Sequence, residues 1–171
     1  QKMRTGGYDG KGVQLLQQSS DSYDAPNLCE SLIDFDKELS VIVARNENGD
    51  VQCFPSVECE FNSEANLVEY LFSPANISKE ITQKANSIAM DLIQKLDMIG
   101  LLAVEFFLGK NGELLVNEIA PRPHNSGHHT IECCNTSQYA QHLRSVLNLP
   151  LGDTTLITPG AMINILGEKG F

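Results

Sequence analysis

Runs of apolar residues separated by polar turns divide much of the chain into short β-strands. The run at 28–33 predicts a buried strand directly after the turn at 24–27. The runs at 38–45 and 51–58 flank a polar turn that contains Gly49, and this spacing predicts a β-hairpin. The other predicted strands cover residues 67–72, 101–108 and 113–119, of which the last two are joined by a four-residue turn.

Two segments carry apolar residues at the spacing of an amphipathic helix. The first begins after Ser78, whose hydroxyl suits an N-cap, and ends near Leu96. Its core-facing positions are expected to be Ile81, Ala85, Ile88, Ala89, Leu92 and Leu96. The second covers residues 137–147 and has Tyr139, Leu143, Val146 and Leu147 on one side. Hairpins combined with such helices predict the α+β class, with antiparallel sheets and packed helices.

The two ends of the sequence indicate that it is part of a longer protein. The apolar tail at 156–167 predicts one more strand, which we expect to lack a partner and to begin a further domain. The other end starts without methionine and runs at once into a glycine-rich segment. We therefore expect further sequence on both sides.

Composition narrows the possible classes of ligand. The 171 residues carry a net charge of −10, which argues against a general nucleic-acid or membrane surface but not against phosphate ligands. No apolar run reaches the roughly 18 residues of a membrane span. The five cysteines include no CxxC pair, so free thiols in a reducing cytosol are expected rather than a disulfide framework or a zinc site.

The glycine-rich segment at 6–12 has two interpretations. Its four glycines would allow close approach of the backbone to a phosphate group, with Lys2, Arg4 and Lys11 as nearby cations. It matches neither the Walker A pattern nor the dinucleotide fingerprint. Glycine content alone therefore leaves open a phosphate cradle or an ordinary hairpin tip.

Two glutamates lie on the strands of the second hairpin. A turn at 109–112 brings Glu105 opposite residues 116–118, so that Glu105 and Glu118 can share one face and one metal ion. Carboxylates beside a polyphosphate commonly hold Mg²⁺, although two strand glutamates can also be solvated surface. The loop that follows is stiffened by Pro121 and Pro123. It carries polar residues in a density typical of a site, namely Arg122, His124, Asn125, Ser126, His128 and His129.

Four segments together resemble a known family, the N5-carboxyaminoimidazole ribonucleotide synthetases, which are ATP-grasp ligases of purine biosynthesis. The segments are Lys2 with GGYDGKG at 6–12, KELS at 37–40, VEFF at 104–107 and NEIAPRPHNSGH at 117–128. They follow the order of the family, and the resemblance covers nearly all of the 171 residues.

The resemblance implies an ATP-grasp fold that is partial here, because the flanking domains of the family are missing. Residues 1–33 would be part of the lid subdomain and the linker strand, 34–152 the main ATP-grasp subdomain, and 153–171 the start of the C-terminal β domain. The implied reaction carboxylates 5-aminoimidazole ribonucleotide with bicarbonate and ATP through carboxyphosphate, with Mg²⁺ as cofactor. The family further implies a cytoplasmic homodimer as full-length protein, without nucleic-acid or membrane partners, and weak or no turnover by this portion alone.

The site residues follow from the same resemblance. The residues that would hold the ATP phosphates are Lys2, Gly7, Tyr8, Asp9, Gly10, Lys11, Gly12 and Val13. The linker backbone that would read adenine is Glu30, Ser31, Leu32 and Ile33. Glu38 would accept the ribose hydroxyls, and Glu105 and Glu118 would bind magnesium beside Asn117. The residues that would face the imidazole substrate, bicarbonate and carboxyphosphate are Tyr8, Asp9, Arg122, His124, Asn125 and Ser126.

The chain departs from the family after residue 58, where Cys59 and Phe61 replace a common Asn and His. The nucleotide contact that this histidine would make in the family is therefore not expected from the resemblance. Two other readings remain open. One is a related formate-activating glycinamide ribonucleotide transformylase, which shares the PRPH-type loop but lacks GGYDGKG. The other is a non-catalytic nucleotide-binding module.

Overall fold

The computed structural model describes residues 1–6, 12–18, 24–62 and 67–165. Its main feature is an antiparallel sheet with the strand order β8-β7-β3-β5-β6-β9, in which β4 also pairs with β3. The strands are β3 (Phe35–Arg45), β4 (Val51–Cys53), β5 (Val57–Asn62), β6 (Leu67–Ser73), β7 (Gly100–Gly109), β8 (Leu114–Ala120) and β9 (Gly160–Ile163). The α+β class with an antiparallel sheet and packed helices, expected from the sequence, is confirmed.

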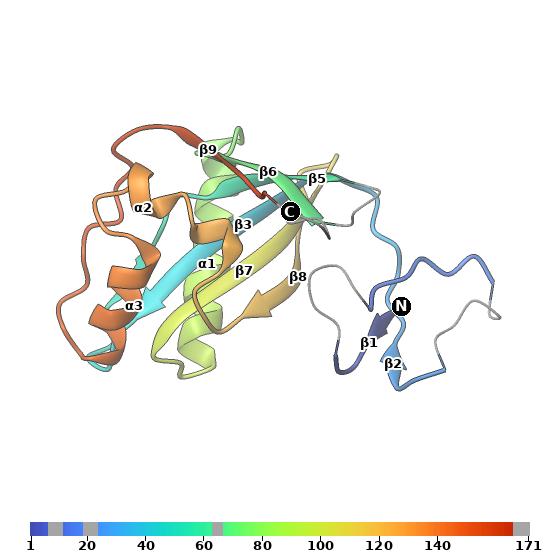
Figure 1. Cartoon of the computed structure of the whole chain (residues 1–171), viewed down its shortest axis with the longest axis horizontal. Helices are drawn as coiled ribbons and strands as arrows, with labels where there is room; N and C mark the ends of the chain where they lie inside the picture. Colours follow the sequence, from blue (N-terminus) through green and yellow to red (C-terminus); the bar gives the residue numbers. More distant parts are fainter. Residues whose placement is uncertain (7–11, 19–23, 63–66, 166–171) are drawn as a thin grey trace, which may run out of the picture.

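The helices divide between the two faces of this sheet. Helix α1 (Lys79–Lys95) buries Ala85, Ala89 and Ile93 against one face. The opposite face is covered by the short helices η2 (Asn125–Gly127) and α2 (Thr130–Cys133) and by α3 (Gln138–Val146). Figure 1 shows α2 and α3 at one end of the molecule and the small β1–β2 sheet at the other.

The alternation of side chains along β3 decides which face carries chemistry. Leu39, Val41 and Val43 belong to the cluster packed with α1. The residues between them, among them Ser40 and Ile42, face the other side, since successive strand residues point to opposite faces. Polar side chains on that second face therefore lie beneath the segment that contains η2, α2 and α3.

A second, two-stranded sheet forms from β1 (Lys2–Met3) and β2 (Asn27–Leu28). The amide of Met3 donates a hydrogen bond to the carbonyl of Gly12 at 2.8 Å, which closes the N-terminal hairpin. Gly12 has a φ of 83°, a conformation that glycine adopts without strain. This sheet places Lys2 near the edge of the main sheet, as the contacts below show.

The first helix and the first hairpin agree with the sequence predictions. Ser78 caps α1, its hydroxyl accepting a hydrogen bond from the amide of Ile81. β3 pairs with β4 around the predicted turn, with Ala44 opposite Gln52. The predicted 51–58 strand is in fact two strands, because residues 54–56 leave the ladder at Pro55, which has no amide hydrogen to donate. Both pieces still pair with β3.

Three other expectations are wrong. Residues 29–33 form no strand, and Leu32 is 80% exposed, because this segment lines an open pocket instead of the core. The apolar side of α3 points outward, while the polar Gln138, Gln141 and Ser145 are buried. The C-terminal strand β9 does have a partner, since it pairs with β6.

Leu96 also lies half exposed at the end of α1, whereas the buried Ile93 was not expected. No helix in the described ranges is long and apolar enough to cross a membrane. All five cysteines are free thiols.

Candidate functional site

Three carboxylates lie on the sheet face opposite α1. Glu105 on β7 is directly opposite Glu118 on β8, so both side chains leave the sheet on the same side. On the other side of β7, Ser40 of β3 pairs with Glu105. Glu38 lies two residues before Ser40 on β3, so its side chain is on the same face. The predicted register of the two glutamates is confirmed, whereas their role as metal ligands stays a prediction.

Burial and repulsion from neighbouring carboxylates perturb Glu105 and Glu38. Burial, followed by the charges of Glu118 and Glu38, raises the pKa of Glu105 to about 7 against the opposing charges of Lys2 and Arg122. The pKa of Glu38 is likewise raised to about 7 by burial and by Glu118, with Lys2 opposing. The raised pKa values show that this face carries too little positive charge to stabilise its carboxylates in the ionised form. A bound cation would supply that charge, so the face would bind a cation favourably.

A β-bulge adds Asn117 to this group. Glu105 pairs with Glu118 while Phe106 pairs with Val116, so Asn117 is an extra residue without an opposite partner. Such bulges re-aim side chains and are common beside active sites. The Asn117 side-chain oxygen accepts a hydrogen bond from Lys2 Nζ at 3.0 Å, and Lys2 also pairs with Glu30 at 3.1 Å. The bulge thus links the sheet to the N-terminal segment.

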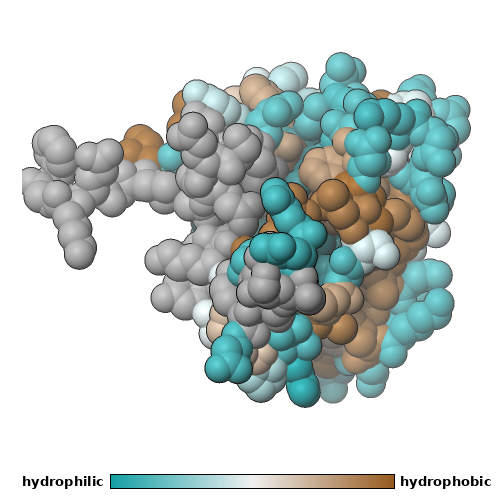
Figure 2. All heavy atoms as spheres, turned by 90° about the vertical axis from the view of Figure 1, so that its right-hand side faces the viewer, coloured by the Kyte–Doolittle hydropathy of each residue, from teal (hydrophilic) through white to brown (hydrophobic). Residues whose placement is uncertain are grey.

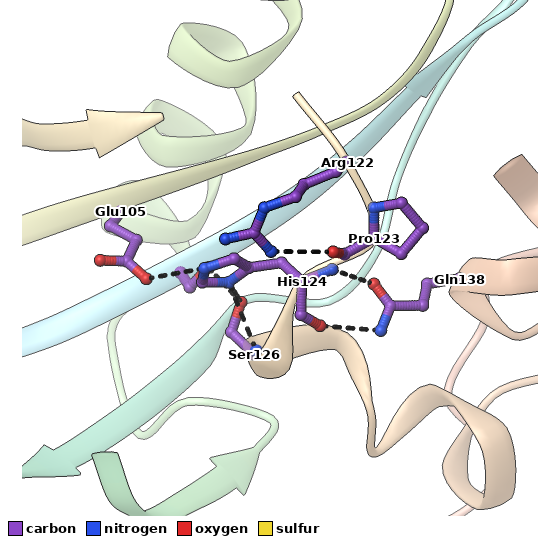
Figure 3. Close-up of polar contacts among 7 residues, drawn as sticks. Glu105, Arg122, Pro123, His124, Ser126 and Gln138 are labelled. Atoms are coloured by element: carbon purple, nitrogen blue, oxygen red, sulfur yellow. Dashed lines mark hydrogen bonds and ion pairs between the residues drawn. The ribbon is translucent and has the colours of Figure 1, made fainter. Parts of the chain in front are cut away.

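The loop after β8 returns over the carboxylates. Arg122 donates from its guanidinium to the carbonyl of Pro123 at 3.1 Å. His124 Nε2 lies 3.7 Å from Glu105 Oε1, and His124 Nδ1 lies 3.0 Å from Ser126 Oγ. Figure 3 shows the imidazole between the Glu105 carboxylate and Ser126, with Arg122 alongside. His124 and Ser126 of the loop, both predicted site residues, thus lie in one polar group with Glu105.

The His124 ring is neutral at physiological pH, because burial and the charge of Arg122 lower its pKa to about 4. The amide of Ser126 points at Nδ1, which makes that nitrogen the acceptor. A consistent assignment has Ser40 donating to Ser126 Oγ at 2.8 Å, Ser126 donating to Nδ1, and the proton on Nε2 facing Glu105. Neutral imidazole can then donate one hydrogen bond beside the acid without adding charge.

A pocket of about 550 Å³ lies between the N-terminal segment, the segment at 29–33 and the sheet. The predicted site residues that line it are Lys2, Val13, Glu30, Ser31, Leu32, Ile33 and Asn117. Phe35 and Phe107 add apolar wall and stack with ring centroids 4.5 Å apart. Figure 2 views the molecule from the side of β1 and β2 and shows hydrophobic surface next to hydrophilic groups there. A flat apolar ring with a polar tail would suit this mixture.

The remaining predicted residues are less informative. Gly12 lies in the N-terminal hairpin, whereas Gly7, Tyr8, Asp9, Gly10 and Lys11 lie outside the described residues. Asn125 Oδ1 is buried and has no hydrogen-bond partner among the described residues. His129 bonds the Ser126 carbonyl through Nδ1 at 3.1 Å, a structural contact.

Two polar residues near the site were missed by the sequence analysis, Ser40 and Gln138. Ser40 could have been recognised, because it alternates with Leu39 and Val41 and follows Glu38 at the period of a strand. Gln138 carried no signal, since its partner His124 is 14 residues away. Cys59, which replaces the usual Asn, lies opposite Glu38 as a buried thiol whose pKa is raised by burial and neighbouring acids.

Comparison with known proteins identifies the class. The family model for the ATP-grasp domain matches residues 1–139, so this chain belongs to the ATP-grasp family. The chain is similar to N5-carboxyaminoimidazole ribonucleotide synthase of Bacillus subtilis (strain 168), with 46% identity over 171 residues. That match covers 96% of this chain but 44% of the relative, so the chain spans less than half of that protein's length.

Solved structures give the same result. The ADP complex of an N5-carboxyaminoimidazole ribonucleotide synthetase is 44% identical with a TM-score of 0.87, over 96% of this chain and 45% of the other. The Aspergillus clavatus synthase in complex with ADP and 5-aminoimidazole ribonucleotide is 37% identical with a TM-score of 0.73, over 79% of this chain and 36% of the other. The family resemblance found in the sequence is therefore confirmed.

Proposed function

We propose that this chain is the central, nucleotide-binding portion of an enzyme that carboxylates 5-aminoimidazole ribonucleotide, consuming ATP and bicarbonate. The products would be N5-carboxyaminoimidazole ribonucleotide, ADP and phosphate. The observation that carries the proposal is the Glu105–Glu118 pair on one face, between a nucleotide-sized pocket and the His124 loop. The similarity to synthetases that bind ADP and the same ribonucleotide supports it.

In this proposal ATP occupies the pocket at 29–33. Adenine would lie between the linker backbone and the Phe35–Phe107 pair. Glu38 lines a neighbouring pocket that shares Phe35 with the first, and it would accept hydrogen bonds from the ribose hydroxyls. Lys2, with the backbone of the glycine-rich segment, would hold the phosphates. Because Lys2 contacts both Glu30 and Asn117, its ammonium is available at the point where pocket and carboxylates meet.

Magnesium fits the donors present. The described residues contain no cluster of three or more acidic, histidine or cysteine ligands, but Mg²⁺ commonly uses one or two carboxylates and takes its other oxygens from phosphate and water. Glu105 and Glu118 would supply these carboxylates. Bound there, the ion would neutralise charge on the phosphates and favour the ionised form of Glu105.

The His124 loop would then face the reacting groups. A bicarbonate oxygen attacks the γ-phosphorus, the bond to ADP breaks, and carboxyphosphate forms. The amine of the ribonucleotide attacks the carboxyl carbon, phosphate leaves, and the amine loses a proton. Arg122 would stabilise the anionic intermediate, and His124 and Asn125 would orient it by hydrogen bonds. A closed lid would protect carboxyphosphate from water.

The deciding assay uses the full-length gene product that contains this chain. We expect ADP release that requires bicarbonate and 5-aminoimidazole ribonucleotide together, with carboxylated product formed in equal amount. Turnover with formate and glycinamide ribonucleotide would instead favour the transformylase. Magnesium-independent ATP binding with no turnover would favour the non-catalytic module.

The organisation of the whole protein belongs to the same proposal. Residues 1–33 would be part of the lid and linker, 34–152 the main subdomain, and 153–171 the start of a C-terminal β domain. We further propose that the full-length protein is a cytoplasmic homodimer with no nucleic-acid or membrane partner, and that residues 1–171 alone turn over weakly or not at all. Sedimentation of the full-length protein tests the first, and the ADP assay on the isolated 171 residues tests the second.

A further inference from the structure

Helix α3 contributes one buried side chain to the site loop, and that side chain is an amide. Gln138 is 0% exposed. Its Oε1 accepts a hydrogen bond from the backbone amide of His124 at 2.9 Å, and its Nε2 donates to the His124 carbonyl at 2.8 Å. Figure 3 shows the Gln138 amide facing the His124 backbone on the side away from Glu105.

These bonds replace a missing strand partner. His124 has extended backbone angles, φ −128° and ψ 154°, but it lies beyond the end of β8. Extended backbone outside a sheet must find other partners for its amide and carbonyl. Gln138 satisfies both at once, and the amide of His124 requires that Oε1 be the atom that faces it.

The position of Gln138 is itself tightly fixed. Its backbone amide donates to Thr130 Oγ1 at 2.8 Å, and Thr130 Oγ1 donates to the Gly127 carbonyl at 2.6 Å. A Cβ on Gly127 would lie 2.4 Å from Gln138 Oε1, so the side chain packs directly against that glycine. Because Gln138 is itself held in place, its two bonds can fix the position of the His124 backbone.

We propose that Gln138 is a positioning residue, which holds the His124 backbone so that the imidazole stays between Glu105 and Ser126 during turnover. Only the kinetic part of this proposal, the expected effect on kcat, rests on the proposed function. Gln138 does not line the nucleotide pocket, so it acts through His124 and leaves ATP binding unchanged.

The helix supplies its own matched control. Gln141, also 0% exposed, bonds the backbone of Gly152 in the same way, accepting from its amide at 2.8 Å and donating to its carbonyl at 3.0 Å. Gly152 lies in the connection between α3 and β9. Gln138 and Gln141 therefore share helix, burial and the paired bonds to one residue's backbone. They differ in the residue that each one holds, and Gln138 Nε2 also lies 3.0 Å from His128 Nδ1.

The test compares Gln138→Met with Gln141→Met in the full-length gene product, below the melting temperature of both. Methionine keeps the volume and removes both bonds to the backbone, and at Gln138 it also removes the contact of Nε2 with His128 Nδ1 at 3.0 Å. We expect Gln138→Met to lower kcat roughly 10- to 100-fold, the usual effect of losing a partner that orients a site residue, with KM for ATP unchanged. Gln141→Met should lower the melting temperature comparably and keep kcat within about twofold. Equal kcat for both variants would overturn the proposal.

A second readout does not depend on the reaction. Ring ¹⁵N shifts of His124, assigned with His124→Gln, should report an acceptor Nδ1 in the wild type, change in Gln138→Met and stay the same in Gln141→Met. Unchanged shifts in Gln138→Met would refute the positioning role, even if the wild type failed the ADP assay and the proposed function with it. Should Gln138→Met not fold, Gln138→Glu keeps the acceptor for the His124 amide, and an intermediate kcat with altered ring shifts is expected. Wild-type kcat and shifts in that variant would contradict the proposal.

Discussion

At the scale of single residues, the acids on the sheet face dominate the behaviour of the site. Glu105 is the most constrained of them, because it is largely shielded from solvent, lies opposite Glu118 and has His124 3.7 Å away. Burying like charges together costs free energy unless a cation joins them. Removing one acid should therefore affect function much more than removing an exposed acid nearby.

Glu105→Gln should lower kcat for ADP formation roughly 100-fold, equivalent to about 2.7 kcal/mol, because one ionic ligand of the proposed magnesium ion is lost. Steady-state assays at several magnesium concentrations measure this. The control is Glu113→Gln, at an exposed position in the turn that precedes β8, which should change kcat less than twofold. Similar kcat in both variants would count against the metal site.

Glu38 should make stability depend on pH in the absence of ATP and magnesium. Its pKa is raised in the fold from 4.5 to about 7, so between these values the folded protein binds more protons than the unfolded chain. The free energy of unfolding therefore falls as pH rises through this window. Glu38→Gln should flatten that decline in urea titrations between pH 4.5 and 7. The exposed Asp36, changed to Asn, should preserve it, and an equally steep decline in Glu38→Gln would refute the assignment.

Which of these residues the sequence could reveal depends on whether their partners are local. Glu105 and Glu118 could be placed on one face because a short turn fixes the pairing of their strands. Ser40 was accessible in principle from the alternation along β3. Gln138 was not, because an amide on a distant helix shows its role only once the loop at 121–126 folds back towards it.

At the scale of elements, α1 follows the rules of an amphipathic helix. Its N-cap bond from the Ile81 amide to Ser78 Oγ is 3.3 Å long. Ser78→Ala should lower the free energy of unfolding by about 1 kcal/mol, as the loss of an N-cap typically does. Ser87→Ala, at an exposed position inside the helix, should be neutral or slightly stabilising in the same urea titration. No difference between the two variants would contradict the capping role.

Helix α3 buries its polar side and exposes its apolar side, the reverse of α1. Hydrophobic periodicity alone could not reveal this orientation. The sequence shows which residues share a side, but not which side meets the protein. Here the polar side of α3 is buried because Gln138 and Gln141 bond backbone groups of two loops, a gain that depends on tertiary structure. The segment at 29–33 misled for a related reason, since its apolar residues line an open pocket.

The outward direction of α3 gives a stability prediction. Leu143 is 58% exposed, so Leu143→Lys should change the free energy of unfolding by no more than about 0.5 kcal/mol. Ile93 on α1 is 0% exposed, and Ile93→Ala should cost about 2–5 kcal/mol. Urea titrations of the two variants measure both. A cost above 2 kcal/mol at Leu143 would mean that this side is covered in the folded protein.

At the scale of the whole molecule, the N-terminal hairpin and the main sheet are tied together through Lys2. Its ammonium contacts Glu30 of the linker and Asn117 of the bulge. Lys2→Met should weaken binding of magnesium–ATP roughly tenfold, about 1.4 kcal/mol, because a cation at the phosphate end of the pocket is lost. Calorimetric titration measures this, and Lys95→Met, which removes a charge from an exposed position in the last turn of α1, should bind normally. Equal affinities would argue against phosphate binding by Lys2.

The extra residue in β8, Asn117, contributes two things to the hairpin, a bulge in the strand and a side-chain oxygen that accepts a hydrogen bond from Lys2. In a regular strand one side receives a side chain only at every second position, about 6.6 Å apart. The bulge lets Asn117 and Glu118, which are adjacent in the chain, both reach toward Lys2 and the acids. Deleting Asn117 would keep Glu118 across from Glu105 and preserve the phase of the strand. It would remove the bulge and the Asn117 oxygen together, whereas Asn117→Ala would remove the oxygen and keep the extra residue. Comparing the two variants would separate what the bulge and the oxygen each add to the grip on a triphosphate.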